Sequence, residues 1–499
     1  MNFERKPIMS SVYQSTRSPE VRADSKQAIL KGLAPDGGLY IWPEMAEHPL
    51  DLEEICASDY IGAAKMVLGH LLPDFTKQEI DECVHGAYDS NFDHPLLTPL
   101  REVDGVQVLE LFHGPTSAFK DMALTILPYL MRTALKETDE KVMILTATSG
   151  DTGKAALSGF QDVDQTAICV FYPDGKVSDI QYRQMATQKG KNVGVFAVQG
   201  NFDDCQSRVK ELFMDEELNR FAADHHVRLS SANSINIGRL IPQVVYYFDA
   251  YRQLVKNGVI TIGDEVSFSV PTGNFGDVLA GYYASLLGLP VKKFYVASNS
   301  NNVLTDFIRT GVYDRNRPFY QTISPSMDIL ISSNLERFLY FLSGQNEELV
   351  AKWMKELAET GRYEIGEEYL KKMQEKFDAD YLNDEQTAEV IADVYKKTGT
   401  VLDPHTAIGY KAAHDHKDEG VVVAVSTASP YKFSRDVLAA LDQEAADEWD
   451  ALHRLDALNQ DQLPEKLAEL EELPILHTTV LEPETMKQAV MDACERLYD

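Results

Sequence analysis

Lys120 stands in surroundings that would turn its amine into a nucleophile. It ends the run from His113 to Lys120, HGPTSAFK, just after a Gly-Pro turn. The turn predicts a helix over Met122 to Leu135, with Thr116 or Ser117 as its cap. A lysine at a helix start meets the positive end of the dipole and loses water, and both effects lower the pKa of its amine. We therefore expect an imine-forming lysine here, the alternative being an ordinary solvated charge.

A glycine-rich loop from Pro271 to Asp277, PTGNFGD, lies between an expected strand and an expected helix. Gly273 and Gly276 let a ligand approach the backbone closely, and consecutive amides at a helix start attract an anion. The pattern predicts a phosphate site, although a tight turn would have the same sequence. A dinucleotide fingerprint is excluded, because G-x-G-x-x-G is absent.

Two further loops follow expected strands. The first, Thr146 to Lys154, reads TATSGDTGK, and its hydroxyls and amides suit a carboxylate. It is not a P-loop, because Thr148 and Ala155 stand where that motif needs Gly and Ser or Thr. The second, Ser426 to Pro430, offers a hydroxyl that could hydrogen-bond a heterocycle nitrogen. Each loop taken alone could also be a plain helix cap or turn.

An amine, a phosphate cup and a carboxylate loop together predict that the chain binds a phosphorylated aldehyde as an imine. Pyridoxal 5'-phosphate (PLP) is the cofactor with that chemistry. We call Gly273, Asn274, Phe275 and Gly276 the phosphate cup.

Short apolar strands and helices alternate from about residue 98 onward, and these elements must position the loops. The expected strands are 141–146, 166–172, 193–198, 227–229, 265–270, 293–297 and 420–425. The expected helices include 60–71, 77–88, 178–188, 202–224, 237–254, 275–287 and one from Lys154. Such alternation is typical of βαβ units and predicts an α/β fold with mostly parallel sheets covered on both faces.

A chain of 499 residues is too long for one ordinary core. We expect four parts: an N-terminal cap domain at 1–97, a smaller α/β domain at 98–234, a larger α/β domain at 235–440 and a peripheral helical tail at 441–499. The smaller domain would carry Lys120 and the loop from Ser149 to Gly153, and the larger one the phosphate cup and Thr427.

The amino-acid composition argues against several classes of binding partner. The net charge of −31, from 47 basic and 78 acidic residues, argues against nucleic acid and anionic membranes. Five cysteines without a C-x-x-C pair predict neither a metal site nor a disulfide scaffold. No apolar run approaches the roughly 18 residues of a spanning helix, and the N-terminus lacks a signal core. We expect a cytoplasmic protein with a small-molecule substrate, either monomer or homodimer.

Six motifs resemble, in the same order, those of the threonine synthases, which are PLP enzymes of fold type II, the tryptophan synthase β-subunit group. They are the runs Gly32 to Tyr40, His113 to Asp121, Ser149 to Gly153, Ser231 to Asn236, Gly273 to Gly276 and Asp403 to Ala407. The resemblance implies two mostly parallel αβα domains with an N-terminal cap and a helical acidic C-terminal tail. It also implies conversion of O-phospho-L-homoserine and water to L-threonine and phosphate.

The resemblance further implies roles for single residues. The implied cofactor-binding residues are Lys120, Gly273, Asn274, Phe275, Gly276, Thr427 and Asp151. The implied substrate-binding residues are Ser149, Gly150, Thr152, Lys176, Ser178, Asn236 and Arg239. Lys120 would also be the catalytic base, and Thr427 would leave the pyridine nitrogen uncharged, which favours elimination and replacement over transamination. Asp151 would lie near the ring hydroxyl, where many relatives of this fold type carry Asn.

Two alternatives stay open. The chain could be another fold type II lyase, such as a threonine or serine dehydratase, or a catalytically silent binder of phosphorylated small molecules. The basic residues Lys176 and Arg239 favour a phosphorylated substrate, and Lys120 argues against the silent binder. His113 could relay protons or be a satisfied loop histidine.

Overall fold

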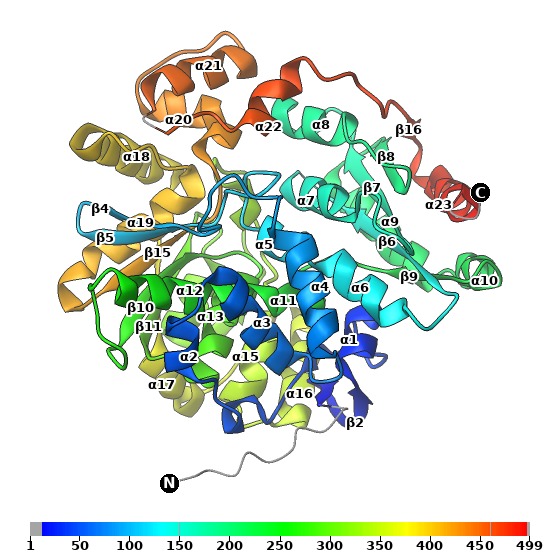
Figure 1. The fold of residues 1–499 in the computed structure, drawn as a ribbon, viewed down its shortest axis with the longest axis horizontal. Helices are drawn as coiled ribbons and strands as arrows, with labels where there is room; N and C mark the ends of the chain where they lie inside the picture. The colour runs from blue at the N-terminus through cyan, green and yellow to red at the C-terminus, as the bar shows by residue number, and fades with distance from the viewer. Residues whose placement is uncertain (1–11, 149, 460, 497–499) are drawn as a thin grey trace.

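Two mainly parallel sheets organise the residues that the computed structural model describes, which are 12–148, 150–459 and 461–496 (Figure 1). The larger sheet has the strand order β14 (Phe377–Tyr381), β11 (Val291–Ser298), β10 (Val266–Pro271), β15 (Val422–Ser426), β5 (Val106–Glu110) and β4 (Leu100–Val103). Strand β4 runs antiparallel to β5, and the other pairs of this sheet are parallel.

The smaller sheet is parallel throughout its described pairs. Its order is β16 (Val480–Leu481), β8 (Val193–Val198), β7 (Thr166–Pro173), β6 (Lys141–Ala147) and β9 (Val227–Ser230). Every residue of the central strand β7 is buried, as expected where helices cover both faces of a parallel sheet.

Helices enclose both sheets. Those that bear on the site or the layers around it are α1 (Ser25–Lys31), α3 (Tyr60–Leu71), α4 (Lys77–Tyr88), α5 (Asp121–Leu124), α6 (Leu127–Leu135), α7 (Asp151–Phe160), α8 (Asp179–Ala186), α9 (Phe202–Met214), α10 (Glu216–Asp224), α11 (Ile237–Leu240), α12 (Pro242–Lys256), α13 (Gly276–Leu286) and α19 (Pro404–Asp415). The others are α2 (Leu52–Cys56), α14 (Val303–Thr310), α15 (Leu335–Leu342), α16 (Glu347–Thr360), α17 (Glu367–Lys376), α18 (Asp384–Thr398), α20 (Ser434–Ala440), α21 (Glu448–Leu458), α22 (Glu465–Ala468) and α23 (Met486–Arg496).

The N-terminal helices join the two sheets. Helix α3 packs on α12, and α4 packs on α6, so the cap touches the helical layers of both sheets (Figure 1). One hydrophobic cluster accordingly runs from Tyr13 through Leu68 and Leu127 to Phe268. The cap therefore packs into one hydrophobic core with helices of both sheets.

The structure confirms most predicted elements and corrects some of their ends. The helices predicted at 60–71 and 77–88 are α3 and α4, with the same limits. The helix predicted at 122–135 is two helices, α5 and α6, and the second has Pro128 in its first turn. The long helix predicted at 202–224 is interrupted at Asp215, whose carboxylate caps α10 by accepting from the N–H of Leu218 at 2.8 Å.

Two segments pair in sheets that the predicted domain limits do not assign to them. Strands β4 and β5 lie inside the range 98–234 expected for the smaller domain, yet they pair in the larger sheet. The tail expected to be peripheral contributes β16 to the edge of the smaller sheet, beside β8. The remaining domain limits stay a prediction.

No helix among the described residues combines the length and the apolar character that crossing a membrane requires.

Candidate active site

The segment that carries Lys120 is anchored to the loop after β15. Phe119 donates its N–H to the carbonyl of Thr427 at 2.8 Å, and Ser429 donates to the carbonyl of Ser117 at 3.0 Å. An antiparallel bridge between Ala118 and Ala428 continues this pairing. Lys120 and Thr427 are thereby brought together at the carboxyl ends of neighbouring parallel strands, where α/β sheets bind ligands.

Asp121 explains much of the HGPTSAFK motif. Its buried carboxylate accepts the N–H and the hydroxyl of Thr116, both at 2.7 Å. A side chain on Gly114 would collide with Asp121, so glycine is required there. The predicted capping by Thr116 or Ser117 is wrong, because α5 begins without a side-chain cap and Thr116 binds Asp121 instead.

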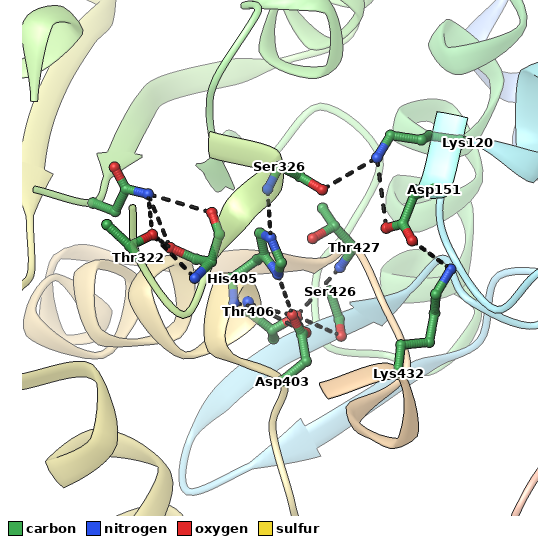
Figure 2. Close-up of polar contacts among 12 residues, drawn as sticks. Lys120, Asp151, Thr322, Ser326, Asp403, His405, Thr406, Ser426, Thr427 and Lys432 are labelled. Atoms are coloured by element: carbon green, nitrogen blue, oxygen red, sulfur yellow. Dashed lines mark hydrogen bonds and ion pairs between the residues drawn. The ribbon is translucent and has the colours of Figure 1, made fainter. Parts of the chain in front are cut away.

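Lys120 points its amine at two polar side chains (Figure 2). Its Nζ lies 3.3 Å from Ser326 Oγ and 3.6 Å from Asp151 Oδ2, and its side chain is 10% exposed. Burial lowers the pKa of Lys120 to about 8, helped by the cations Arg239 and Lys432 and opposed by Asp151. The fraction of free amine at neutral pH is therefore much larger than in an ordinary lysine, although the ammonium still predominates, and free amine is what a nucleophile or base needs.

Asp151 is held between two lysines. Its Oδ1 accepts from Lys432 Nζ at 2.7 Å (Figure 2). Lys432 also donates to the carbonyl of Thr116 at 2.9 Å. Burial pushes the pKa of Asp151 upward, but Lys432 and Lys120 outweigh it and hold that pKa well below its usual range. The carboxylate therefore stays ionised beside the Lys120 amine.

The phosphate cup opens at the start of α13. Phe275 adopts a left-handed φ of 60°, and its ring packs against Phe338 and Phe377 at centroid distances of 5.8 and 5.9 Å. Within the described residues, the backbone N–H groups of Asn274, Phe275 and Gly276 have no protein acceptor. Unpaired amides at a helix start attract an anion, so the geometry agrees with the predicted phosphate site.

Ser326 connects the cup to Lys120. A methyl group placed on Gly273 would lie 2.9 Å from the carbonyl oxygen of Ser326, whose hydroxyl is the one that Lys120 contacts. The N–H of Ser326 donates to His405 Nε2 at 3.2 Å. Amine and cup thus lie on two sides of one serine.

Thr427 is positioned by the motif that begins at Asp403. Asp403 accepts from His405 Nδ1 at 2.8 Å and from the hydroxyl of Thr406, which in turn accepts the N–H of Thr427 at 3.3 Å. Figure 2 shows Thr427 between the Lys120–Asp151 pair and this group. Because His405 donates from Nδ1 and accepts at Nε2, it is uncharged in this arrangement.

Asn236 caps the short helix α11, which carries Arg239, and the two residues differ in which of their polar groups are already bonded. Asn236 is fully buried and donates to the carbonyls of Ile29 at 2.9 Å and Ser231 at 3.1 Å. Its role as a substrate ligand stays a prediction. Arg239 is 5% exposed, and burial lowers its pKa to about 10. In the described residues no carboxylate pairs with Arg239, whose Nη1 donates to the carbonyl of Ala232 at 3.0 Å.

The loop predicted to hold the substrate carboxylate is described except for Ser149, which lies outside the described residues. Gly150 has a φ of 151° and leaves no room for a side chain beside Gln181. Thr152 is half-buried in the first turn of α7. Ser178 caps α8, and Lys176 is exposed in the turn before it.

His113 is satisfied on both nitrogens. Nδ1 bonds Asp93 at 2.8 Å and Nε2 bonds Glu110 at 2.9 Å. Burial would lower the pKa of His113, but the two carboxylates raise it to about 9. The imidazolium is thus fixed in an ion pair, and the interpretation as a satisfied loop histidine describes this arrangement better than a proton relay.

Three contributors to the site were not predicted. Ser326 and Lys432 are common residue types in short 3-10 helices far along the chain from Lys120, and no local pattern singles them out. His405 lies within the run Asp403 to Ala407, which resembles a family motif, so the sequence marked this segment although it did not single out His405.

PLP fits the groups present. Its phosphate would meet the unpaired amides of the cup, where a methyl group on Gly276 would find no protein atom closer than 3.5 Å. Its aldehyde would meet Lys120, which Ser326 links to the cup. Asp151 and Thr427 offer an ionised and a neutral side chain to the ring.

Three family models match successive parts of the chain. Residues 94–428 match the family model "Pyridoxal-phosphate dependent enzyme". Residues 12–88 match "Threonine synthase N terminus", and residues 406–490 match "Threonine synthase, C-terminal".

Individual relatives cover most of the chain. Threonine synthase of Pseudomonas aeruginosa is 40% identical over 84% of this chain and 88% of its own length. The human protein threonine synthase-like 1 is 38% identical over 83% of this chain, which spans only 58% of that longer relative.

Solved structures resemble the chain from end to end. The PLP-bound threonine synthase from Brucella melitensis superposes with a TM-score of 0.87 at 37% identity, covering 97% of this chain and 100% of that one. The yeast threonine synthase also reaches 0.87, at 32% identity, over 98% and 100%. The protein described here belongs to the threonine synthase family of PLP-dependent enzymes.

Proposed function

We propose that this protein converts O-phospho-L-homoserine and water to L-threonine and phosphate, with PLP as its cofactor. The observation that carries the proposal is the Lys120 amine, which is buried, has a pKa of about 8 and is joined through Ser326 to the phosphate cup. Family membership supports the same reaction.

Lys120 acts as the base of the reaction. When bound, PLP supplies an electron sink for the pair left on a substrate carbon after a proton is removed. The free amine of Lys120 takes the proton from the substrate's α-carbon. Asp151, 3.6 Å away, stabilises the ammonium that results.

The substrate's phosphate binds at Arg239. A buried guanidinium without a carboxylate partner favours an incoming anion, and its planar fork suits a phosphate. The further proposed contacts to the phosphate are Lys176, Ser178 and Asn236. Among these three residues, Lys176 carries a solvent-exposed charge.

The substrate's carboxylate binds at the start of α7, where Ser149, Gly150 and Thr152 surround the first amides of the helix. Asp151 of the same turn would lie near the ring hydroxyl of the cofactor, and its charge is matched by Lys432. Thr427 would offer a neutral hydroxyl to the pyridine nitrogen.

We also propose a cytoplasmic setting, no nucleic-acid partner and a monomeric or homodimeric state. The charge of −31 supports the exclusion of nucleic acid.

The deciding experiment measures phosphate release and L-threonine formation from O-phospho-L-homoserine, with and without added PLP. We expect both products in equal amounts and only with the cofactor. Formation of 2-oxobutyrate from L-threonine without phosphate release from the phosphorylated substrate would identify a dehydratase instead. Colourless protein with neither activity would identify a silent binder.

A further inference from the structure

Asn334 has a buried side-chain amide whose NH₂ group finds no acceptor in the described part of the protein. The residue is fully buried, and its Nδ2 is left without a hydrogen-bond partner. A buried donor without an acceptor destabilises a protein, so such a group is expected where a ligand completes it.

The orientation of this amide is determined by Arg337. The guanidinium has only donors, and its Nη1 lies 2.5 Å from Asn334 Oδ1. Its Nε donates to the carbonyl of Tyr40 at 2.8 Å and its Nη2 to that of Ile235 at 2.6 Å, so Arg337 itself cannot turn away. The oxygen of the amide must face Arg337, and the NH₂ group must face the opposite way.

In this orientation the NH₂ group of Asn334 faces the phosphate cup. The backbone N–H of Asn334 donates to the carbonyl of Asn274 at 3.1 Å, which fixes the residue against the loop. A methyl group placed on Gly276 would lie 3.5 Å from Asn334 Nδ2, closer than any other atom. The neighbouring Ser332 donates to the carbonyl of Gly273 at 2.7 Å, so this segment forms a second wall of the cup.

We infer that the side-chain amide of Asn334 donates a hydrogen bond to the cofactor phosphate, with Arg337 holding it in the donating orientation. The contact would add a side-chain donor to the backbone amides of α13. The positive charge of Arg337 polarises the amide and strengthens a bond to an anion. The inference rests on PLP being the ligand of the cup.

The test compares the affinities of the apoprotein for PLP and for pyridoxal, which lacks the phosphate. Asn334→Ala should weaken PLP binding about 10- to 100-fold, as for the loss of a hydrogen bond to a charged group, and leave pyridoxal binding within about twofold. The ³¹P resonance of bound PLP should shift in this variant. Asn346→Ala is the matched control, because it removes an exposed helix cap from the same part of the chain.

Asn334→Asp separates phosphate binding from a packing role. A carboxylate would pair better with Arg337 and raise the melting temperature of the apoprotein, yet it would repel the phosphate and weaken PLP binding more than Ala does. Equal losses for PLP and pyridoxal in Asn334→Ala, or unchanged PLP binding, would overturn the inference. Wild-type protein that fails to bind PLP would instead refute the cofactor assignment, so the two failures are distinguishable.

Discussion

At the scale of single residues, the proposed reactive centre is Lys120, whose pKa is lowered mainly by burial and adjusted by three neighbours of opposite effect. Asp151 favours the ammonium of Lys120, whereas Lys432 and Arg239 oppose it. A second buried lysine, Lys154, also has a pKa lowered by burial to about 8, but its Nζ donates to Gln188 at 2.6 Å. A lowered pKa alone therefore does not distinguish Lys120 from Lys154, and the proposed role of Lys120 depends on its neighbours as well.

Replacing Lys120 by Ala should abolish turnover and leave the fold intact. The base is lost, so we expect the rate to fall by about 10³-fold or more. Borohydride reduction followed by mass spectrometry should find the pyridoxyl group on Lys120 in wild-type protein and nowhere in the variant. Lys154→Ala is the control and should keep the adduct. An adduct on another lysine of active protein would contradict the assignment.

The pH dependence of Lys120 reactivity tests its environment. Because burial disfavours the ammonium, acylation of Lys120 in the apoprotein should rise with a midpoint near pH 8 rather than at the 10.5 of an ordinary lysine. Asp151→Asn should move the midpoint lower and Lys432→Met should move it higher. Peptide mapping resolves Lys120 from Lys154. A midpoint above 10 would show that the amine is solvated.

At the scale of elements, Gly273 and Gly276 of the phosphate cup have different structural roles. A side chain on Gly273 would press on the backbone of Ser326 at 2.9 Å, whereas one on Gly276 would meet protein at 3.5 Å or beyond. Gly273 is thus needed for packing of the protein itself, and Gly276 for the space beside the helix start.

This difference predicts opposite phenotypes. Gly276→Val should leave the melting temperature of the apoprotein nearly unchanged and weaken PLP binding by at least about tenfold, because its side chain enters the phosphate space. Gly273→Ala should lower the melting temperature already in the apoprotein. Thermal unfolding and absorbance titration distinguish the two. Wild-type cofactor affinity in Gly276→Val would show that the phosphate cup does not bind the cofactor phosphate.

Local patterns predicted those elements whose signals are local. The capping box of Thr76 and Glu79 marks the start of α4, and Gly-rich loops after strands mark Lys120 and the cup. The partners of β5 could not be predicted, because a strand carries no sign of the sheet that it joins. Lys432 was missed for a similar reason, since only the fold brings it to Asp151.

At the scale of the whole molecule, the C-terminal segment completes the smaller sheet. Strand β16 pairs with β8, and Met486 and Val490 of α23 are fully buried in a cluster with Met143 and Phe171. The same sheet positions Asp151 after β6. Stability of the tail and geometry of the site are therefore linked.

Met486→Ala should destabilise the smaller sheet by about 2–5 kcal/mol, the usual cost of such a truncation in a packed core. Denaturant unfolding measures this, with the half-buried Met491→Ala as the control of smaller effect. Equal effects of the two variants would place α23 outside the core.

The pairing of β5 with β15 has a consequence for how this enzyme folds during its synthesis. More than 300 residues separate Leu109 from Val425, its partner across the sheet, and the edge strand β16 emerges later still. During synthesis the larger sheet therefore cannot be completed until β15 has been made, and the smaller sheet waits for β16. Until then β5 and β8 each keep an unpaired edge, and the contact between Lys120's segment and Thr427 cannot form.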